Sequence, residues 1–255
     1  MHPHDRSMCP RPAGGRGIPE ARLHLLDAFA LQAAGTTVEM PEGLQRLLAF
    51  LAQHGPSPRA VVAGTLWPEV PESHALASLR TGVWRLNKVM PGLVCADGFQ
   101  LRLDPQLSID SQEQEAFAIR LLRQHPDDEL WVREGVSTLW RRELLPGWYD
   151  DWIIFERERL CQLRLHALEH TTRLLVRQRE LDTALQLALE AVRTEPLRET
   201  ATAVLISVYL AEGNVVDAIH QRDVFTDHLW RELGLEPSPR LARLVPRPRG
   251  SVMRA

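Results

Sequence analysis

The sequence has few cysteines, a single lysine and no long apolar run. Its three cysteines, Cys9, Cys95 and Cys161, are far apart and form no C-x-x-C pair, which excludes a disulfide framework and a zinc finger. The longest apolar stretch, residues 201–211, is about half the roughly 20 residues that a membrane helix needs. The N-terminal segment lacks the apolar core of a secretory signal. We therefore expect a cytoplasmic protein with reduced thiols and no membrane partner.

The motifs of nucleotide-dependent and hydrolytic enzymes are also missing. Lys88 follows Asn87, so it cannot complete the G-K-[ST] of a phosphate-binding loop, and no G-x-S-x-G elbow occurs. With 255 residues, 44% of them apolar and 25% charged, the chain can still form one large or two modest domains. The sequence therefore predicts a globular protein that is not an enzyme and needs no cofactor.

The first half of the chain has the pattern of an α+β domain. Residues 22–40 alternate between apolar and polar side chains with a turn at Gly35, which predicts a small antiparallel meander. Three helical patterns follow, and apolar segments on both sides of Asp97-Gly98 predict a β-hairpin. The predicted helices span residues 41–54, 58–66 and 73–90.

The second half reads as helix throughout and contains an internal repeat. Residues 181–185 and 215–219 are offset by 34 positions, the tetratricopeptide period, and each opens a helix after a short turn. Ala184 and Ala218 fall where paired helices must approach closely. Such pairs stack into a curved solenoid whose concave side binds proteins. The predicted helices span residues 110–124, 128–139, 154–178, 181–193, 197–211, 215–232 and 239–244.

These patterns predict two domains between two tails. The Pro/Gly/Arg-rich tails, residues 1–19 and 246–255, are expected to be disordered. Residues 20–108 form a winged helix-turn-helix that we expect to bind DNA alone, and residues 109–245 form an all-α, tetratricopeptide-like domain.

The third predicted helix concentrates positive charge. Residues 73–90 contain three basic side chains and no acidic one, whereas residues 20–108 as a whole hold seven basic and eight acidic side chains. At 100° per residue the apolar side chains fill one face of this helix, and the opposite face and its flanks are polar, basic and aromatic. The apolar face comprises Leu76, Leu79, Val83, Leu86 and Met90. The candidate DNA-binding residues are Ser78, Arg80, Thr81, Trp84, Arg85 and Lys88 on the helix and Arg102 on the hairpin.

These residue types suit a helix in the major groove. Arginine can fork onto guanine O6 and N7, threonine can contact base edges, and lysine and the indole N–H can bind phosphates. Any surface helix exposes some basic residues. The preceding meander, the absence of acids and the following hairpin favour DNA binding over that simpler interpretation.

The order of several short motifs resembles one known family, the Streptomyces antibiotic regulatory proteins. This resemblance covers residues 23–245 and implies a response-regulator-type winged helix joined to a bacterial transcriptional activation domain. It also implies an activator of a secondary-metabolite or similar operon that binds tandem direct repeats as a side-by-side homodimer and contacts RNA polymerase. Asn87 departs from the family, because many relatives have a basic residue there. The motifs are LQRLL (44–48), LWP (66–68), LRTGVWRL (79–86), Trp152, ERERL (156–160), LRLHALE (163–169), PLRE (196–199), EG (212–213) and ELGLEPSP (232–239).

Three alternatives stay open. Residues 166–170 match the H-x-x-E-H of inverted zinc peptidases, but a zinc site needs a third ligand and a cleft, so we predict no metal site. The cluster of Trp148, Tyr149 and Trp152 could form a ligand pocket, although aromatics before a long helix more often fill a core. The whole chain could also be a helical-repeat adaptor with a degenerate winged helix.

Overall fold

The structure is a computed structural model that describes residues 20–124 and 142–245. Both predicted tails and the predicted helix 128–139 lie outside these described residues. The described chain separates into two compact units. The first unit contains residues 20–113 and 143–158, and the second contains residues 114–124, 142 and 159–245. The first unit therefore extends beyond the predicted border at residue 108 and includes a segment from much later in the sequence.

The N-terminal meander forms as predicted. Leu23 and Leu31 point into the core from adjacent antiparallel strands, and a two-residue turn at Ala34-Gly35 with φ of 49° and 76° joins the second and third strands. A fourth strand pairs in parallel with the first, which the sequence did not predict. The strands are β1 (Ala21–His24), β2 (Ala30–Ala33), β3 (Thr36–Val38) and β7 (Ser108–Ile109), in the order β3-β2-β1-β7.

The three predicted helices of the first half are confirmed. Proline precedes the first residue of each helix, where its missing N–H costs no hydrogen bond. Gly55, with φ of 67°, ends the first helix. The helices are α1 (Glu42–His54), α2 (Arg59–Leu66) and α3 (Glu72–Val89).

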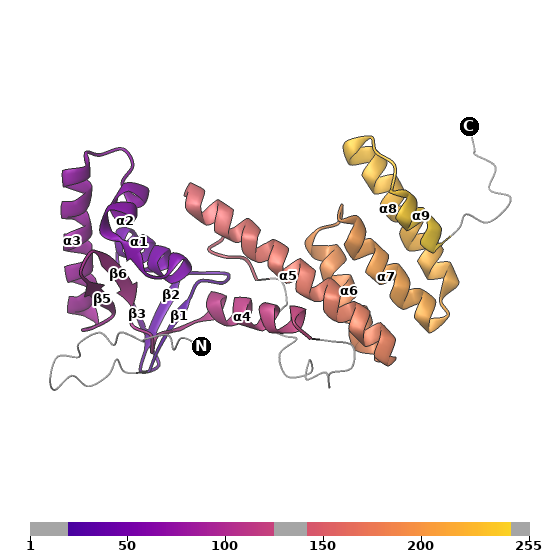
Figure 1. Cartoon of the computed structure of the whole chain (residues 1–255), viewed down its shortest axis with the longest axis horizontal. Coiled ribbons are helices and arrows are strands. Elements are labelled where there is room, and N and C mark those ends of the chain that lie inside the picture. The colour runs from indigo at the N-terminus through magenta and orange to yellow at the C-terminus, as the bar shows by residue number, and fades with distance from the viewer. Residues whose placement is uncertain (1–19, 125–141, 246–255) are drawn as a thin grey trace, which may run out of the picture. The chain divides into compact units, whose positions relative to one another are not determined.

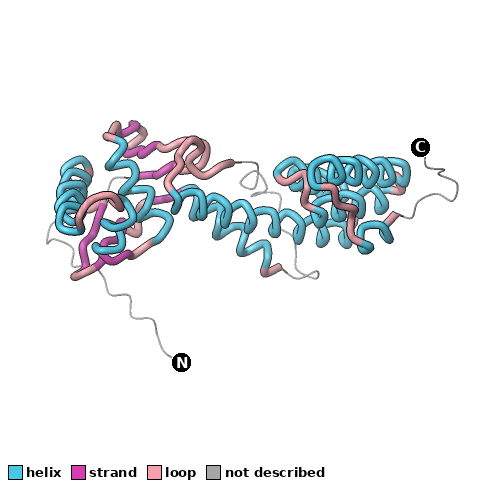
Figure 2. The backbone as a smooth tube through the Cα atoms, turned by 90° about the horizontal axis from the view of Figure 1, so that it is seen from above, coloured by secondary structure: helices cyan, strands magenta, loops and turns pink. Residues whose placement is uncertain are grey.

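A second small sheet completes the winged helix. The predicted hairpin consists of β5 (Val94–Asp97) and β6 (Gln100–Leu103), and the two-residue strand β4 (Ser57–Pro58) pairs with β6. The strand order is β4-β6-β5. Figure 1 shows α3 beside this hairpin, and every strand of the described residues lies in the first unit (Figure 2). The expected winged helix-turn-helix is thus present.

Residues 143–158 pack against the meander and α1 within the first unit. Leu144 forms an isolated bridge with Leu26, and the Leu145 N–H donates to the Leu25 carbonyl oxygen at 2.8 Å. Trp152 is 8% exposed and lies edge-on to the ring of Phe50. The predicted helices left residues 140–153 outside any helix, and residues 142–150 are non-helical, with backbone groups that pair with the meander. The long helix begins at Asp151, three residues before its predicted start.

Two further side chains stabilise this docking. Arg157 donates hydrogen bonds to the carbonyl oxygens of Leu144, Leu145 and Trp148 at 2.7–3.0 Å, which fixes the loop before the long helix. Arg46 of α1 forms an ion pair with Asp150.

The aromatic cluster divides between core and surface. Trp148 stacks on Phe29, with ring centroids 6.1 Å apart, and Trp152 is buried, as the core interpretation expected. Tyr149 is exposed. The two tryptophans therefore attach the segment 143–158 to the winged helix.

The second unit is built from antiparallel helices. Ala184 and Ala218, the small residues of the predicted repeat, are both fully buried in apolar clusters, α6 packs on α7, and α7 packs on α8. α4 and α5 begin in the first unit and continue into the second. The helices are α4 (Asp110–Leu122), α5 (Asp151–Gln178), α6 (Leu181–Thr194), α7 (Glu199–Glu212), α8 (Val215–Leu233) and α9 (Pro239–Leu244). In the described ranges none of the helices is long and apolar enough to cross a membrane.

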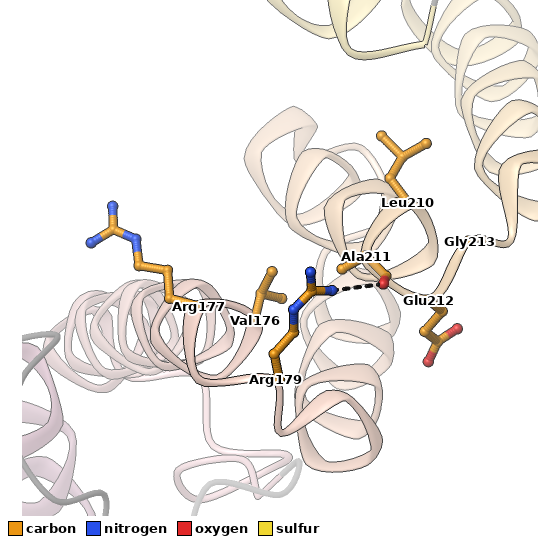
Figure 3. A pocket seen from close by; sticks show the side chains of 7 residues that line it. All are labelled: Val176, Arg177, Arg179, Leu210, Ala211, Glu212 and Gly213. Atoms are coloured by element: carbon orange, nitrogen blue, oxygen red, sulfur yellow. Dashed lines mark hydrogen bonds between the residues drawn. The ribbon is translucent and has the colours of Figure 1, made fainter.

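The 34-residue repeat extends to the way the helices end. Arg179 follows α5 and Gly213 follows α7, and both have left-handed φ, 63° and 85°. The residue after each donates its N–H to the carbonyl oxygen five residues earlier, at 3.0 and 2.8 Å, so both turns are Schellman caps. Arg179 Nη1 also donates to the Ala211 carbonyl oxygen at 3.2 Å, and this hydrogen bond joins the two turns (Figure 3).

Candidate DNA-binding surface

α3 buries one face against α1 and α2. Leu79 and Leu86 are fully buried. Gly82 lies between them, and a Cβ atom there would come within 3.1 Å of Leu47 Cδ2 on α1, so the glycine permits the close approach of the two helices.

The predicted apolar face of α3 is rotated slightly from the observed one. Leu76 and Val83 are only partly buried, whereas Ala75 and Gly82 are buried at the centre of the contact. Small side chains occupy the centre because they allow the helix axes to approach. The opposite face stays in solvent as predicted.

All six candidate residues of α3 are exposed. The Trp84 side chain is 62% exposed, and Lys88 Nζ lies 5.2 Å from the centroid of its ring, a cation–π contact. The Thr81 hydroxyl donates to the Ala77 carbonyl oxygen at 3.0 Å, which leaves its methyl group and oxygen lone pairs toward solvent. The exposed set is Ser78, Arg80, Thr81, Trp84, Arg85 and Lys88.

The positive charges of this face are not neutralised by a described carboxylate. None of the ion pairs between described residues involves Arg80, Arg85 or Lys88. A basic face that keeps its charge attracts phosphate electrostatically.

Asn87 connects α3 to the hairpin. Its Nδ2 donates to the Val94 carbonyl oxygen at 2.8 Å, and its Oδ1 accepts the Val94 N–H at 3.0 Å. The side-chain amide thus pairs with β5 as another strand would. The sequence showed Asn87 only as a departure from the basic residue of many relatives, and the structure gives it a positioning role.

The hairpin differs from its prediction in its turn. Asp97 pairs with Gln100, so the loop is Gly98-Phe99 instead of Asp97-Gly98. Gly98 has φ of 54°, the positive value that the first loop residue of a type II′ turn needs. Arg102, the predicted DNA-binding residue of the hairpin, is partly buried opposite Cys95, whereas Phe99 at the tip is 89% exposed. An aromatic residue directly after the turn glycine could have indicated an exposed ring at the hairpin tip, but Phe99 was not among the predicted site residues.

The H-x-x-E-H motif has a structural role in the second unit. His166 is exposed, and His170 Nε2 lies 3.1 Å from a backbone carbonyl oxygen at the end of α4. Glu169 is buried and accepts hydrogen bonds from Arg198 Nε at 2.6 Å and Thr200 Oγ1 at 2.7 Å. In the described part of the chain no group of three His, Cys, Asp or Glu side chains could hold a metal ion. Glu169 is therefore bound to Arg198 and is not positioned to activate water.

A winged helix-turn-helix with a basic exposed third helix, followed by tetratricopeptide-like helices, defines a class of two-domain transcriptional regulators. Residues 112–247, more than half of the chain, match the family model of the bacterial transcriptional activator domain. The chain belongs to this family, and its sequence is of the Streptomyces antibiotic regulatory protein type.

Two regulators named AfsR are similar to most of the chain. The regulatory protein AfsR of Streptomyces coelicolor is 28% identical over 221 residues, and that of Streptomyces griseus is 30% identical over 230 residues. Each match covers 81% of this chain and 22% of the relative, so the chain spans about a fifth of the length of these curated relatives.

A solved structure supports the fold. Mycobacterium tuberculosis EmbR, in complex with a low affinity phosphopeptide, superposes with a TM-score of 0.69 at 20% identity. The match covers 88% of this chain and 64% of the EmbR chain. This similarity supports the arrangement of a winged helix followed by a helical domain.

Proposed function

We propose that the chain is a sequence-specific DNA-binding transcriptional activator that inserts α3 into the major groove. The observation that carries the proposal is the α3 face, where Arg80, Arg85 and Lys88 are exposed with no described carboxylate partner. The tight attachment of β5 to α3 through Asn87 places a hairpin beside that helix, as a wing requires. Because the sequence resembles activators of secondary-metabolite operons, the proposed target is the promoter of such an operon. The proposed location of the protein is the cytoplasm.

Substitutions on α3 separate base contacts from phosphate contacts. Arg85 lies at the centre of the exposed face, so Arg85→Ala is expected to weaken specific binding by about 1–3 kcal/mol and to relax preference at one base pair. Lys88→Ala is expected to weaken binding to all sequences alike, because ammonium groups bind phosphate. Electrophoretic mobility shift against variants of a duplex selected from a random library measures both effects.

The result also distinguishes the adaptor alternative. A chain that shows no salt-dependent binding to any selected duplex is a helical-repeat adaptor with a degenerate winged helix. Unchanged affinity and base preference in Arg85→Ala would exclude α3 as the recognition helix.

We further propose that two copies bind side by side on tandem direct repeats. Three basic groups on one α3 face neutralise only a few phosphates, too little for specific binding among competing genomic sites. Repeats spaced by about 10–11 base pairs place both recognition helices on one side of the duplex. The helical second unit then holds the neighbouring copy as a homodimer on DNA and contacts RNA polymerase.

The spacing of the repeats tests this arrangement. Inserting about five base pairs, half a helical turn, between the repeats is expected to abolish cooperative binding, because the second copy then faces the opposite side of the duplex. Footprinting over a range of protein concentrations gives the cooperativity, and an insertion of a full turn is the control. Equal cooperativity after the half-turn insertion would contradict side-by-side binding even if each site is still occupied.

A further inference from the structure

The tip of the β5–β6 hairpin carries an aromatic ring that makes almost no contact with the protein. Phe99 is 89% exposed, the largest value among the exposed large apolar side chains in the part of the chain that the structure describes. Single exposed apolar residues are common on protein surfaces, so exposure alone assigns no role. The attachment, reach and charge of the hairpin tip provide the argument.

The backbone beneath the Phe99 ring is held from two sides. The Phe99 carbonyl oxygen accepts the Arg59 N–H at 2.9 Å, at the start of α2. Ser57 of β4 pairs with Leu101 of β6, immediately behind the tip. The backbone that carries the ring is therefore fixed, so little backbone entropy is lost when the ring meets a binding partner.

The hairpin is long enough to reach the next groove of a duplex bound by α3. Asn87 fixes β5 to the last turns of α3 at Val94, and the strand then runs four residues to the turn. At roughly 3.3 Å per residue it extends about 13 Å from this anchor. Neighbouring major and minor grooves are separated by about half of the roughly 34 Å helical repeat. A phenylalanine side chain at the tip spans the difference between the reach of the strand and this separation.

The chemistry of the tip limits how it can contact DNA. Asp97, the last residue of β5, is exposed one position before the turn, and a carboxylate there is not attracted to the negative potential of DNA. Phe99 is the apolar group that the tip offers, so its contact with DNA is apolar. Apolar wedges, phenylalanine among them, insert between base pairs from the minor groove and bend the duplex.

We infer that Phe99 is a minor-groove wedge that inserts at a flexible base step beside the α3 site and bends the DNA. Flexible pyrimidine–purine steps unstack at the lowest cost, so Phe99 adds a preference for such a step without a hydrogen bond to any base. This inference rests on the proposed DNA-binding function and adds a residue and a mode of sequence selection to it.

The test uses the full chain and a duplex selected from a random library by the purified chain. Energy transfer between dyes on the two ends reports bending, and titrations at several salt concentrations report affinity. Phe99→Ala is expected to straighten the duplex and weaken binding about tenfold, the typical loss of one base-stacking contact, with an unchanged salt slope. Phe155→Ala, which removes a ring that is 74% exposed on α5, is the matched control and is expected to change neither quantity.

A second arm changes the DNA. Replacing the pyrimidine–purine step beneath the tip by an A-tract step is expected to weaken wild-type binding and to leave Phe99→Ala unaffected. Unchanged bending and affinity in Phe99→Ala would overturn the wedge while α3 binding persists. Weaker binding with a flatter salt slope and the same bend would also overturn it, because Phe99 would then position a phosphate contact. Failure of the wild-type chain to select any duplex would overturn both the wedge and the proposed function.

Discussion

Replacing Trp152 by alanine is expected to destabilise the first unit by about 3–5 kcal/mol, the usual loss for a buried tryptophan. Trp152 is 8% exposed and lies 5.3 Å from Phe50 and 5.6 Å from His54, measured between ring centroids. Its removal leaves a cavity where residues 143–158 meet α1, and partial relaxation of the surroundings does not fill such a cavity. Urea denaturation followed by circular dichroism measures the change in the free energy of unfolding.

Two further variants test whether the loss of stability comes from the buried contact of Trp152. Trp152→Phe retains an aromatic ring at the contact and is expected to lose less than half as much stability. Trp230→Ala removes a tryptophan that is 60% exposed on α8 and is expected to change stability by less than about 0.5 kcal/mol. Equal losses in Trp152→Ala and Trp230→Ala would show that burial at Trp152 does not stabilise the unit.

A fragment of residues 20–108 tests the same contact more severely. It lacks the whole segment 143–158 and also Asp110, whose carboxylate accepts the Leu25 N–H at 2.8 Å in the buried interior. We expect this fragment to unfold without a cooperative transition, in contrast to the independent DNA-binding domain that the sequence predicted. A cooperative melt of the fragment would show that the segment is dispensable.

Replacing Glu169 by alanine is expected to destabilise the second unit by about 3–5 kcal/mol at neutral pH, because it leaves a partly buried guanidinium without its partner. Glu169 lies on α5, and its carboxylate holds Arg198 and Thr200, which flank the start of α7. An exposed ion pair serves as the control. Arg22 and Glu113 are about half exposed, and Glu113→Ala is expected to cost less than about 1 kcal/mol.

The effect of Glu169 is expected to depend on pH. Burial raises the pKa of Glu169, but hydrogen bonds from Thr200 and Arg198 and the charges of Arg198 and Arg173 outweigh burial and hold the pKa below its ordinary value of 4.5. A carboxyl group with a lowered folded-state pKa stabilises the fold fully above its unfolded-state pKa and loses this contribution as the pH falls toward its folded-state pKa. The stability difference between wild type and Glu169→Ala should therefore be constant near neutrality and shrink below about pH 4.5. A difference that grows on acidification would contradict this assignment.

Local periodicity was enough to predict most helices and the exposed side of α3. Leu44, Leu47, Leu48 and Leu51 follow the spacing i, i+3, i+4, i+7. This spacing predicted α1, because it places the four apolar side chains on one face of a helix. The exposure of the α3 face followed from the same rule. The buried centre of the α3 contact did not follow from this rule. Gly82 is buried because α1 approaches it closely, and it has no apolar side chain that a periodic pattern would include.

Other features depend on partners that are distant in sequence. The two-residue strands β4 and β7 are too short to show alternation, and they are defined only by pairing with β6 and β1. Docking of residues 143–158 rests on contacts such as the hydrogen bond from the Asp27 N–H to the Glu143 carbonyl oxygen, between residues more than a hundred positions apart. Asn87 gains its positioning role only when the chain returns at Val94.

The return of residues 143–158 to the first unit delays its folding on the ribosome. Domains fold as they are synthesised, at roughly 5–20 residues per second, so the approximately 45 residues between 113 and 158 take about 2–9 s. During this interval the nascent winged helix exposes the side of Phe50 that Trp152 later covers and the Leu25 carbonyl oxygen that later accepts the Leu145 N–H. Such a surface is what a chaperone binds on an emerging chain. The first unit is therefore complete only after residues 143–158 have been synthesised, so a product truncated before residue 143 lacks the segment that closes this unit.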